Sequence, residues 1–372
     1  MKNTFGTSVS ITLFGESHGE AIGATLDGLC PGVLVDADFI SAQLSRRRPN
    51  GKTDTPRVEK DEFKILSGVF NGKTTGTPIT VVIPNENTKS SDYNYGVARP
   101  SHADYSAYMK YHGYEDFRGG GHFSGRITAP IVALGAIAIK ALEKIGVKIG
   151  THILSCGGVC DKEFTSNLSL LSSQLDELQN RDSQALPTIS PCGEEMAEKI
   201  LEAKKYGDSI GGTIQTAIMG IPAGVGEPWF DTIEGILSHA VFSIGGIKGI
   251  EFGLGFGFAK MRGSQANDPF ALSYDGDVVT LSNHNGGVNG GITNGMPIIF
   301  NCAVKPTPSI SQPQSTVNFT SGEETSLEIK GRHDPAIIRR ICVVVDSVVA
   351  ITVCDMLSQR YGTDIFLKGF EK

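Results

Sequence analysis

The residue types that bind anions and move protons gather in one short span of the chain, residues 99–126. Arginine holds phosphates and carboxylates with a planar fork of donors, and histidine transfers protons near neutral pH. Three consecutive glycines, 119–121, allow the backbone to approach a ligand closely. The arginines and histidines of the span are Arg99, His102, His112, Arg118, His122 and Arg126. Together they predict a site for an anionic ligand with acid–base capacity, and the alternative is a solvated, glycine-rich surface loop.

A second polar turn, Gly15 to Gly19, follows an alternating β-rich segment at 9–14. The turn fits Gly-x-Ser-x-Gly, the nucleophile elbow of α/β-hydrolases. That elbow needs a helix directly after the serine, whereas residues 21–26 have the pattern of a strand. We therefore expect a hairpin that carries Ser17 and His18 at its tip, and a serine hydrolase is the disfavoured alternative.

Residues 36–47 predict a helix that ends in positive charge. Asp36 is a suitable N-cap, and apolar residues recur after it at helical spacing. Three arginines, 46–48, follow and precede a proline. At a helix C-terminus they can complement the helix dipole and stay solvated. The functional alternative is a loop that carries arginines and closes over an anion.

Two apolar segments, 129–142 and 335–360, predict long buried helices. Asp334 as N-cap and Pro335 at the first helical position form a start signal for the second. Each segment begins just after an arginine-containing turn with a nearby proline. This echo weakly indicates two similar halves that pack through their main helices, with strands outside.

The remaining periodic segments complete a mixed pattern of helices and strands. Surface helices are expected at 167–180 and 193–205, and a further helix is expected at 231–242. Strands are expected at 63–70, 79–84, 147–154, 213–219, 251–258 and 297–304. Residues 306–326 are rich in serine, threonine and proline and predict an extended loop.

Composition limits the class of protein. The chain has 372 residues, 20% of them charged, and a net charge of −7, which argues against nucleic-acid binding by bulk charge. Seven cysteines in no framework spacing favour reduced thiols in the cytoplasm, and none has zinc-site spacing, so no metal is expected. We expect no signal peptide and no membrane span.

The ordered motifs of this chain resemble those of the chorismate synthases over nearly its whole length. The motifs that carry the resemblance are Gly15-Glu16-Ser17-His18-Gly19, Arg46-Arg47-Arg48-Pro49, Arg99-Pro100-Ser101-His102-Ala103-Asp104-Tyr105, Arg118-Gly119-Gly120-Gly121, Ser124 with Arg126, Gly290-Gly291-Ile292, Lys305-Pro306-Thr307 and Gly331-Arg332-His333-Asp334-Pro335. One of these motifs alone would be weak, but all of them in the family's order are specific.

The resemblance implies a lyase that converts 5-enolpyruvylshikimate 3-phosphate (EPSP) to chorismate and phosphate by 1,4-anti elimination. This is the last step of the shikimate pathway, and it requires reduced FMN without net redox change. The resemblance also implies one α+β domain over residues 1–372, built as a β-α-β sandwich with buried central helices between antiparallel sheets, and assembled as a homotetramer.

The resemblance assigns catalytic roles to five residues. His102 resembles the histidine that protonates the leaving phosphate, and His18 resembles the histidine placed near the flavin ring. Asp334 resembles the aspartate that assists proton removal. The serines that relay or position these protons match Ser17 and Ser124. Asp334 as a plain helix cap and His18 as a satisfied turn histidine are the alternatives.

Cofactor and substrate positions are carried over in the same way. The substrate has a phosphate and two carboxylates, which call for several arginines. Its expected ligands are Arg48, Arg99, Arg126 and Arg332. The expected FMN contacts are Arg47, His122, Phe123, Ser124, Gly245, Gly246, Gly290, Lys305, Pro306, Thr307, Pro308, Ser309 and Arg332. No Gly-x-Gly-x-x-Gly of the Rossmann type is involved.

Three places depart from the commoner family pattern. His122-Phe123 stands where an arginine and a small residue are frequent, Gly125 replaces a usual alanine, and the 50–53 loop is short. Nothing has the pattern of an added nicotinamide domain, so we expect NADPH to act only indirectly, through an external flavin reductase. A non-catalytic phosphoanion- or RNA-binding module is the remaining alternative, disfavoured by the acidic net charge.

Overall fold

Two long apolar helices form the centre of the molecule. α3 (Thr128–Lys144) and α8 (Ile338–Tyr361) pack against each other, and most residues of both are buried because neither helix has a broad polar face. The computed structural model describes residues 2–55, 59–86, 95–329 and 333–370. Gly135 lets the helices approach closely, since a Cβ there would lie 2.3 Å from the Cβ of Ser347. The two predicted core helices are confirmed.

Two shorter helices complete this central layer. α1 (Ala37–Arg47) contacts α3, and α6 (Ile233–Val241) contacts α8. The carboxylate of Asp36 accepts hydrogen bonds from two backbone N–H groups at the start of α1, and the hydroxyl of Thr232 accepts one at the start of α6. The predicted helix at 36–47 and its N-cap are confirmed.

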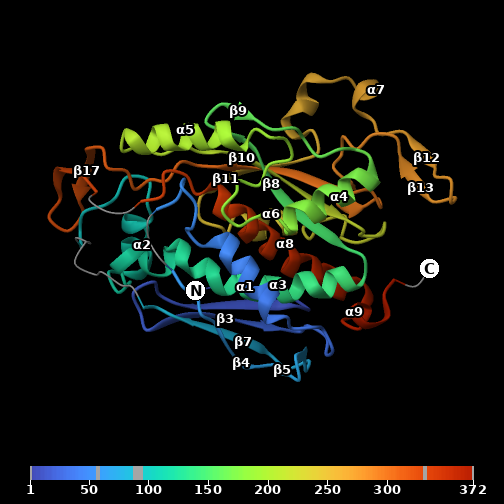
Figure 1. Cartoon of the computed structure of the whole chain (residues 1–372), viewed down its shortest axis with the longest axis horizontal. Helices are drawn as coiled ribbons and strands as arrows, with labels where there is room; N and C mark the ends of the chain where they lie inside the picture. The colour runs from blue at the N-terminus through green and yellow to red at the C-terminus, as the bar shows by residue number, and fades with distance from the viewer. Residues whose placement is uncertain (1, 56–58, 87–94, 330–332, 371–372) are drawn as a thin grey trace.

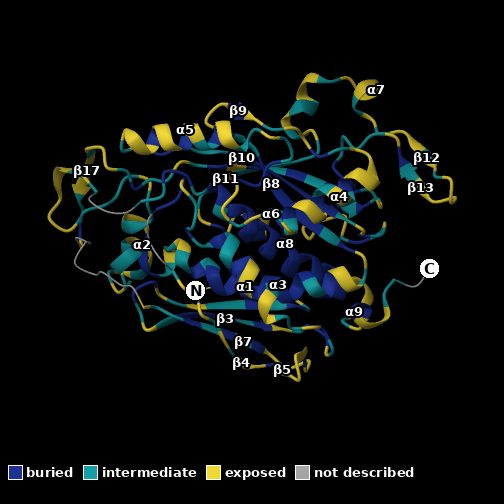
Figure 2. Ribbon diagram, viewed as in Figure 1, coloured by how far each residue is buried: buried dark blue, intermediate teal, exposed yellow. Residues whose placement is uncertain are grey.

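Two five-stranded antiparallel sheets lie on opposite sides of the helices (Figure 1). Across the first sheet the order is β1 (Thr4–Phe5), β2 (Ser10–Gly15), β3 (Ala21–Asp27), β7 (Ile79–Pro84) and β4 (Lys64–Ser67). Across the second it is β11 (Ile247–Phe252), β16 (Ile298–Val304), β10 (Gly212–Met219), β8 (Lys148–Cys156) and β9 (Val159–Cys160). Buried residues concentrate in the helices between them (Figure 2). The predicted mixed α+β class is confirmed.

Both sheets share one connectivity. Along the chain, the first half runs β2, β3, α1, β4, β7, α3, and the second runs β8, β10, α6, β11, β16, α8, apart from inserted elements that include the helices at 168–179 and 193–205. In space the four strands lie in the order β2-β3-β7-β4 and β8-β10-β16-β11. In both halves the fourth strand therefore lies between the second and the third.

The other elements lie at the periphery. α4 (Leu168–Gln179) and α5 (Gly193–Lys205) contact β8, which confirms the two predicted surface helices. In the described part of the chain, the remaining helices are α2 (Asp104–Tyr111), α7 (Gly263–Ala266), α9 (Ile365–Lys368) and the 3₁₀ turns Arg118–Phe123, Gly125–Ile127 and Gly255–Lys260. The small hairpins pair β5 (Val69–Phe70) with β6 (Lys73–Thr74), β12 (Phe270–Leu272) with β13 (Val278–Thr280), β14 (Val288–Asn289) with β15 (Ile292–Thr293), and β17 (Gln314–Asn318) with β18 (Glu323–Leu327).

Three predicted segments were wrong in detail. The strand expected at 251–258 ends at Phe252, because Gly253 takes a φ of +55° and turns the chain against the carbonyl of His284. The strand expected at 63–70 is broken at Gly68, where φ is +81°. The loop expected at 306–326 contains part of the β17–β18 hairpin, because cross-strand pairing overrides its polar composition.

Two helical stretches have the length and composition to cross a membrane, Gly125–Lys144 and Ile338–Tyr361. Within their most apolar windows, 78% and 100% of the residues are buried inside the protein. Core helices of soluble proteins meet the same criterion, and this burial explains the apolar sequences of both stretches.

Candidate functional site

The glycine triplet lies between two histidines that come from distant parts of the sequence. A Cβ on Gly119 would lie 2.4 Å from the ring of His18, and a Cβ on Gly120 would lie 3.3 Å from Cε1 of His102. Both glycines have positive φ, at +63° and +83°. The triplet thus needs glycine for its conformation and for the space that the two rings fill.

The tip of the β2–β3 hairpin is fastened to this triplet. The backbone N–H of Ser17 donates to the carbonyl of Gly121 at 3.2 Å, and its hydroxyl donates to the carbonyl of Gly119 at 3.0 Å. β2 and β3 pair from Ser10 to Gly15, which confirms the predicted hairpin. A strand rather than a helix follows Ser17, so the geometry of a hydrolase elbow is absent there.

His102 belongs to a compact ionic group with Arg99 and Asp104. Its Nδ1 lies 2.9 Å from Oδ1 of Asp104 and 3.0 Å from Nη2 of Arg99. Arg99 donates to the two carboxylate oxygens from Nη2 at 2.6 Å and from Nε at 2.8 Å. Burial tends to raise the pKa of Asp104, but hydrogen bonds from Arg99 and His102 outweigh it and hold that pKa well below its usual range.

Lys305 joins the loop of His102 to the second sheet. Its Nζ donates to the carbonyl of Ser101 at 2.7 Å, and its backbone N–H donates to the carbonyl of Gly246 at 2.9 Å. Burial lowers the pKa of the Lys305 ammonium group, and the charge of Lys248 lowers it further. A cation that is destabilised in this way gains from a nearby anion.

The segment after Lys305 carries an unpaired polar atom. The hydroxyl of Thr307 is buried and has no hydrogen-bond partner in the described part of the chain, whereas its carbonyl accepts from Ser209 at 2.7 Å. Buried hydroxyls normally have partners. The rest of the predicted segment runs through Pro306, Pro308 and Ser309.

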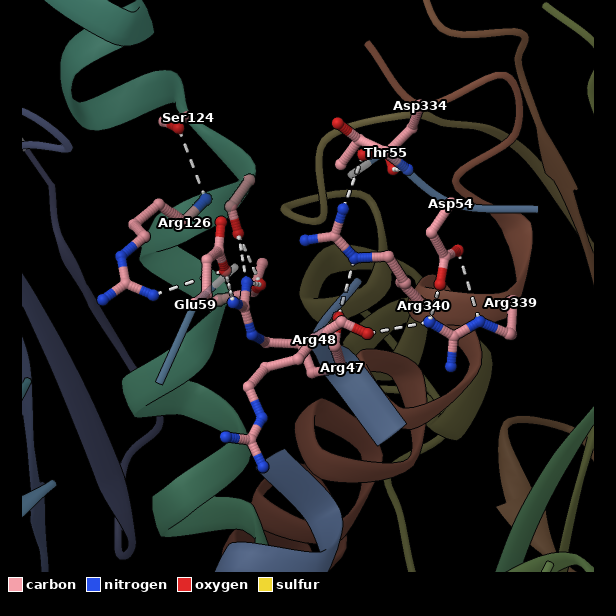
Figure 3. A network of polar contacts seen from close by, with 12 residues as sticks. Arg47, Arg48, Asp54, Thr55, Glu59, Ser124, Arg126, Asp334, Arg339 and Arg340 are labelled. Atoms are coloured by element: carbon pink, nitrogen blue, oxygen red, sulfur yellow. Dashed lines mark hydrogen bonds and ion pairs between the residues drawn. The ribbon is translucent and has the colours of Figure 1, made fainter. Parts of the chain in front are cut away.

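Arg47 and Arg126 lie around two carboxylates that the sequence did not single out. Arg47 donates to Glu59 and to Asp61, and Arg126 forms an ion pair with Asp61. The other donors of Arg126 reach Oδ1 of Asn85 at 3.2 Å and a backbone carbonyl. Ser124 begins the next turn, and its hydroxyl accepts from the backbone N–H of Arg126 (Figure 3). The guanidinium groups of both arginines are thus held by protein acceptors.

Arg340 links this cluster to Asp334. Its Nε donates to the carbonyl of Arg47 at 2.7 Å, and its Nη1 pairs with Asp334 at 2.5 Å (Figure 3). The other oxygen of Asp334 accepts from the backbone N–H of Thr55 at 3.1 Å. The predicted N-cap role of Asp334 is wrong, because α8 begins at Ile338 and the carboxylate is bound by these other donors instead.

Arg48 differs from its neighbours. Its Nη1 donates to the carbonyl of Lys60 at 2.6 Å, and this is the one side-chain hydrogen bond that it makes among the described residues. Its side chain is half-buried. Arg48 therefore keeps more donor capacity for a ligand than Arg47 or Arg126 does.

The other predicted contacts are scattered around this centre. His122 lies 2.8 Å from the carbonyl of Gly15 through Nδ1, and Phe123 is exposed beside the ring of Tyr111. Gly245 is exposed just after α6. Gly290 lies in the β14–β15 turn, and the residue after it, Gly291, packs on Thr232. Because Thr232 is the N-cap of α6, Gly290 lies at the opposite end of α6 from Gly245. Arg332 and Gly331 lie outside the described residues.

Sequence reasoning missed three carboxylates of the site. Asp104, Glu59 and Asp61 each bind a predicted arginine or histidine. The signal for Asp104 was its position two residues after His102, inside the motif that runs from Arg99 to Tyr105. In the described ranges, no group of three or more His, Cys, Asp or Glu side chains is arranged to hold a metal ion.

Comparison with known proteins gives a consistent result. The family model described as "Chorismate synthase" matches residues 9–358. A curated relative named chorismate synthase from Thermococcus kodakarensis is 45% identical over 357 residues, which cover 95% of this chain and 97% of the relative. Another with this name, from Dehalococcoides mccartyi, is 43% identical over 361 residues and covers 96% of both chains.

A solved structure agrees with these sequence matches. The chain is similar to a protein described as "Crystal Structure of Chorismate Synthase", with a TM-score of 0.75 and 30% sequence identity. The match covers 96% of this chain and 94% of that chain.

Proposed function

This chain belongs to the chorismate synthase family, and from that premise we propose that it converts EPSP to chorismate and phosphate by 1,4-anti elimination. It is an enzyme, a lyase of aromatic amino acid biosynthesis. In the elimination, the electron pair of a C–H bond forms one double bond, the existing double bond moves by one position, and the C–O bond to phosphate breaks. Atoms and electrons balance without an oxidant.

One observation carries this proposal: His18 and His102 contact neighbouring glycines of a single backbone turn. An anti elimination loses its proton and its leaving group from opposite faces of the substrate. It therefore benefits from proton-transfer groups held on a common frame but on separate elements. His102 acts as the proton donor to the leaving phosphate, and His18 maintains protonation near the flavin. Ser17 relays or positions these protons.

The substrate's anionic groups have a suitable ligand in Arg48, whose donors are mostly uncommitted. Arg126 and Arg99 contribute positive charge, although their donors are held by protein acceptors. Arg332 retains its proposed role by family match alone. Asp334 assists proton removal, and its carboxylate forms an ion pair with Arg340.

The residues of the chain fit FMN. A Cβ on Gly245 or on Gly290 would have no neighbour within 4 Å, so a ligand can approach the backbone at these two expected contacts. Thr307 offers a buried hydroxyl without a partner, and Lys305 offers an ammonium group that is destabilised by burial. Both suit the FMN phosphate. The other expected contacts are Arg47, His122, Phe123, Ser124, Gly246, Pro306, Pro308 and Ser309.

When bound in its reduced form, FMN supplies an electron-rich ring that the elimination requires although it has no net redox change. The chain's own residues bind the substrate anions, exclude water and move protons. The proton on Nε2 of His102 passes to a phosphate oxygen as the C–O bond breaks. Ser124 orients Arg126 at the start of the turn before α3.

The test is an anaerobic assay of EPSP consumption with dithionite-reduced FMN, with chorismate absorbance and phosphate release followed together. We expect equal amounts of both products and none with oxidised FMN. His102→Ala should bind FMN with unchanged affinity and lose at least about 10²-fold in turnover, because it lacks the acid. Failure of the folded, FMN-binding chain to form chorismate would reject the proposal.

The repeated connectivity supports a finer view of the fold. Two β-β-α-β-β-α units with the same strand order, packed through α3 and α8, are the arrangement that an internal duplication produces. We therefore propose a β-α-β sandwich that arose by pseudo-duplication and folds as one domain over residues 1–372. One hydrophobic cluster that includes residues of both sheets supports the single domain.

The remaining proposals concern the cellular compartment, the source of reduced FMN and the oligomeric state. All seven cysteines are free, which supports a reducing cytoplasm. Reduced FMN is proposed to come from an external flavin reductase, with NADPH consumed there, and adding NADPH to the chain with oxidised FMN tests this. A homotetramer is proposed from the family, supported by exposed aromatic side chains such as Trp229 and Phe230.

A further inference from the structure

We propose that Asp104 is a positioning residue that holds the His102 ring with Nδ1–H towards its carboxylate and Nε2 towards the glycine triplet. This inference rests on the proposed function, because it identifies the group that sets up the proton donor. Asp104 is the first residue of α2, two positions after the histidine. Its side chain therefore reaches back over the loop that carries His102.

The proton on Nδ1 can be assigned from the neighbouring charges. Nδ1 lies within 3.0 Å of both Oδ1 of Asp104 and Nη2 of Arg99. Arginine can only donate, and the same Nη2 already donates to Oδ1 at 2.6 Å. The carboxylate can only accept when it is ionised. The arrangement that satisfies all three groups has a proton on Nδ1, donated to Asp104.

Asp104 is held as an anion from several directions. Arg99 donates to it from Nε, from Nη2 and from its own backbone N–H, the last at 2.9 Å. Its place in the first turn of α2 puts the carboxylate at the positive end of the helix dipole, which stabilises an anion there. These donors fix the carboxylate in place, so the ring that it binds is fixed as well.

The other side of the ring faces Gly120. A Cβ there would lie 3.3 Å from Cε1 and 3.6 Å from Nε2 of His102, so the glycine leaves Nε2 open towards the triplet. Lys305 anchors the loop at the carbonyl of Ser101, directly before the histidine. With Nδ1 occupied, Nε2 is the nitrogen that can give a proton to the leaving phosphate, and the ring then becomes neutral with its proton retained on Nδ1.

The experiment uses the full chain with histidine labelled by ¹⁵N, and the His102 signals are assigned by their loss in His102→Ala. We expect the neutral ring of the wild type to carry its proton on Nδ1, and Asp104→Asn to lose that preference. We also expect Asp104→Asn to reduce kcat by about 10²-fold, with KM for EPSP and affinity for FMN within about threefold of wild type. Asp104→Glu, which keeps the charge, should recover part of the preference for a proton on Nδ1 and part of kcat.

Asp268→Asn is the matched control. Asp268, like Asp104, accepts hydrogen bonds from a side chain and from a backbone N–H, at 2.5 Å from the hydroxyl of Ser282 and at 2.8 Å from the N–H of His284, but it makes no hydrogen bond to His102 or to another proposed site residue among the described residues. Its kcat should stay within about threefold of wild type. An unchanged His102 tautomer or an unchanged kcat in Asp104→Asn overturns the proposal, as does an equal loss of kcat in the control. The NMR result does not need turnover, so a failure of the proposed reaction would be seen separately.

Discussion

The backbone conformation at Gly119 leaves the space that the ring of His18 occupies. Its φ of +63° is uncommon for residues with a side chain, and the ring of His18 and the hydroxyl of Ser17 occupy the space where a Cβ would lie. Glycine at this position therefore serves both the turn and the placement of His18 and Ser17 against it.

Replacing Gly119 with alanine should therefore displace His18. We expect Gly119→Ala to lower the free energy of unfolding by about 1–3 kcal/mol through left-handed strain and overlap. Turnover should fall more than stability alone explains. Gly125→Ala is the control, since a Cβ there has no neighbour within 4 Å. Chemical denaturation and the anaerobic assay measure both effects, and equal behaviour of the two variants would contradict this account.

At the scale of the elements, a polar row crosses the second sheet. Gln215 of β10 is opposite His152 of β8 on one side and Asn301 of β16 on the other. Asn301 is in turn opposite Glu251 of β11, to which it donates at 3.3 Å. The row ends at Asp161, whose carboxylate is 3.2 Å from Nδ1 of His152. Strand register aligns these side chains on the face away from the central helices.

Gln215 is the centre of this row, and its loss should be costly. Its Oε1 accepts from the buried backbone N–H of Phe164 at 2.7 Å, and its Nε2 donates to Asn301 at 3.0 Å. Gln215→Leu leaves both groups unpaired, so we expect a loss of about 2–4 kcal/mol in the free energy of unfolding by urea denaturation. Thr213→Val, on the same strand but half-buried, should cost less than about 1 kcal/mol. Equal costs would show that the row has no special role.

For the whole molecule, the two sheets and the central helices α1, α3, α6 and α8 share one core, to which α5 and α9 also contribute residues. Ionic groups are placed at its boundary and inside it, and their charge states couple stability to pH. Burial tends to raise the pKa of Asp161, but hydrogen bonds from His152 and Ser190 outweigh it and leave that pKa well below its usual range. Asp346, fully buried in α8, has the opposite shift, because burial raises its pKa more than Arg46 lowers it.

The lowered carboxyl pKa values predict acid sensitivity. Because the folded pKa of Asp161 lies below its unfolded value of about 3.9, its contribution is complete above that pH and is lost as pH falls towards the folded pKa. Asp104 acts in the same direction. We expect stability to fall steadily from about pH 5 to pH 2, and Asp161→Asn to flatten this slope. Urea midpoints across the range test it, and an unchanged slope in the variant would be contrary to this assignment.

The sequence by itself determined the local elements. Apolar periodicity predicted the two core helices, and the cap at Asp36 predicted α1, because both signals are read within a few turns of chain. The alternating segment before Ser17 predicted the hairpin for the same reason. The residue types of the candidate site were also evident, since chemistry depends on side chains that are visible in the sequence.

Only the tertiary structure decided which of these residues meet. Asp334 looked like a cap from its neighbours, yet its carboxylate pairs with Arg340 and the backbone of a segment about 280 positions away. Arg126 looked available for a ligand, yet Asp61 holds it. Ion pairs and glycine contacts of this kind form between elements that are distant in sequence. Their energies depend on separation and burial in space, which local patterns do not contain.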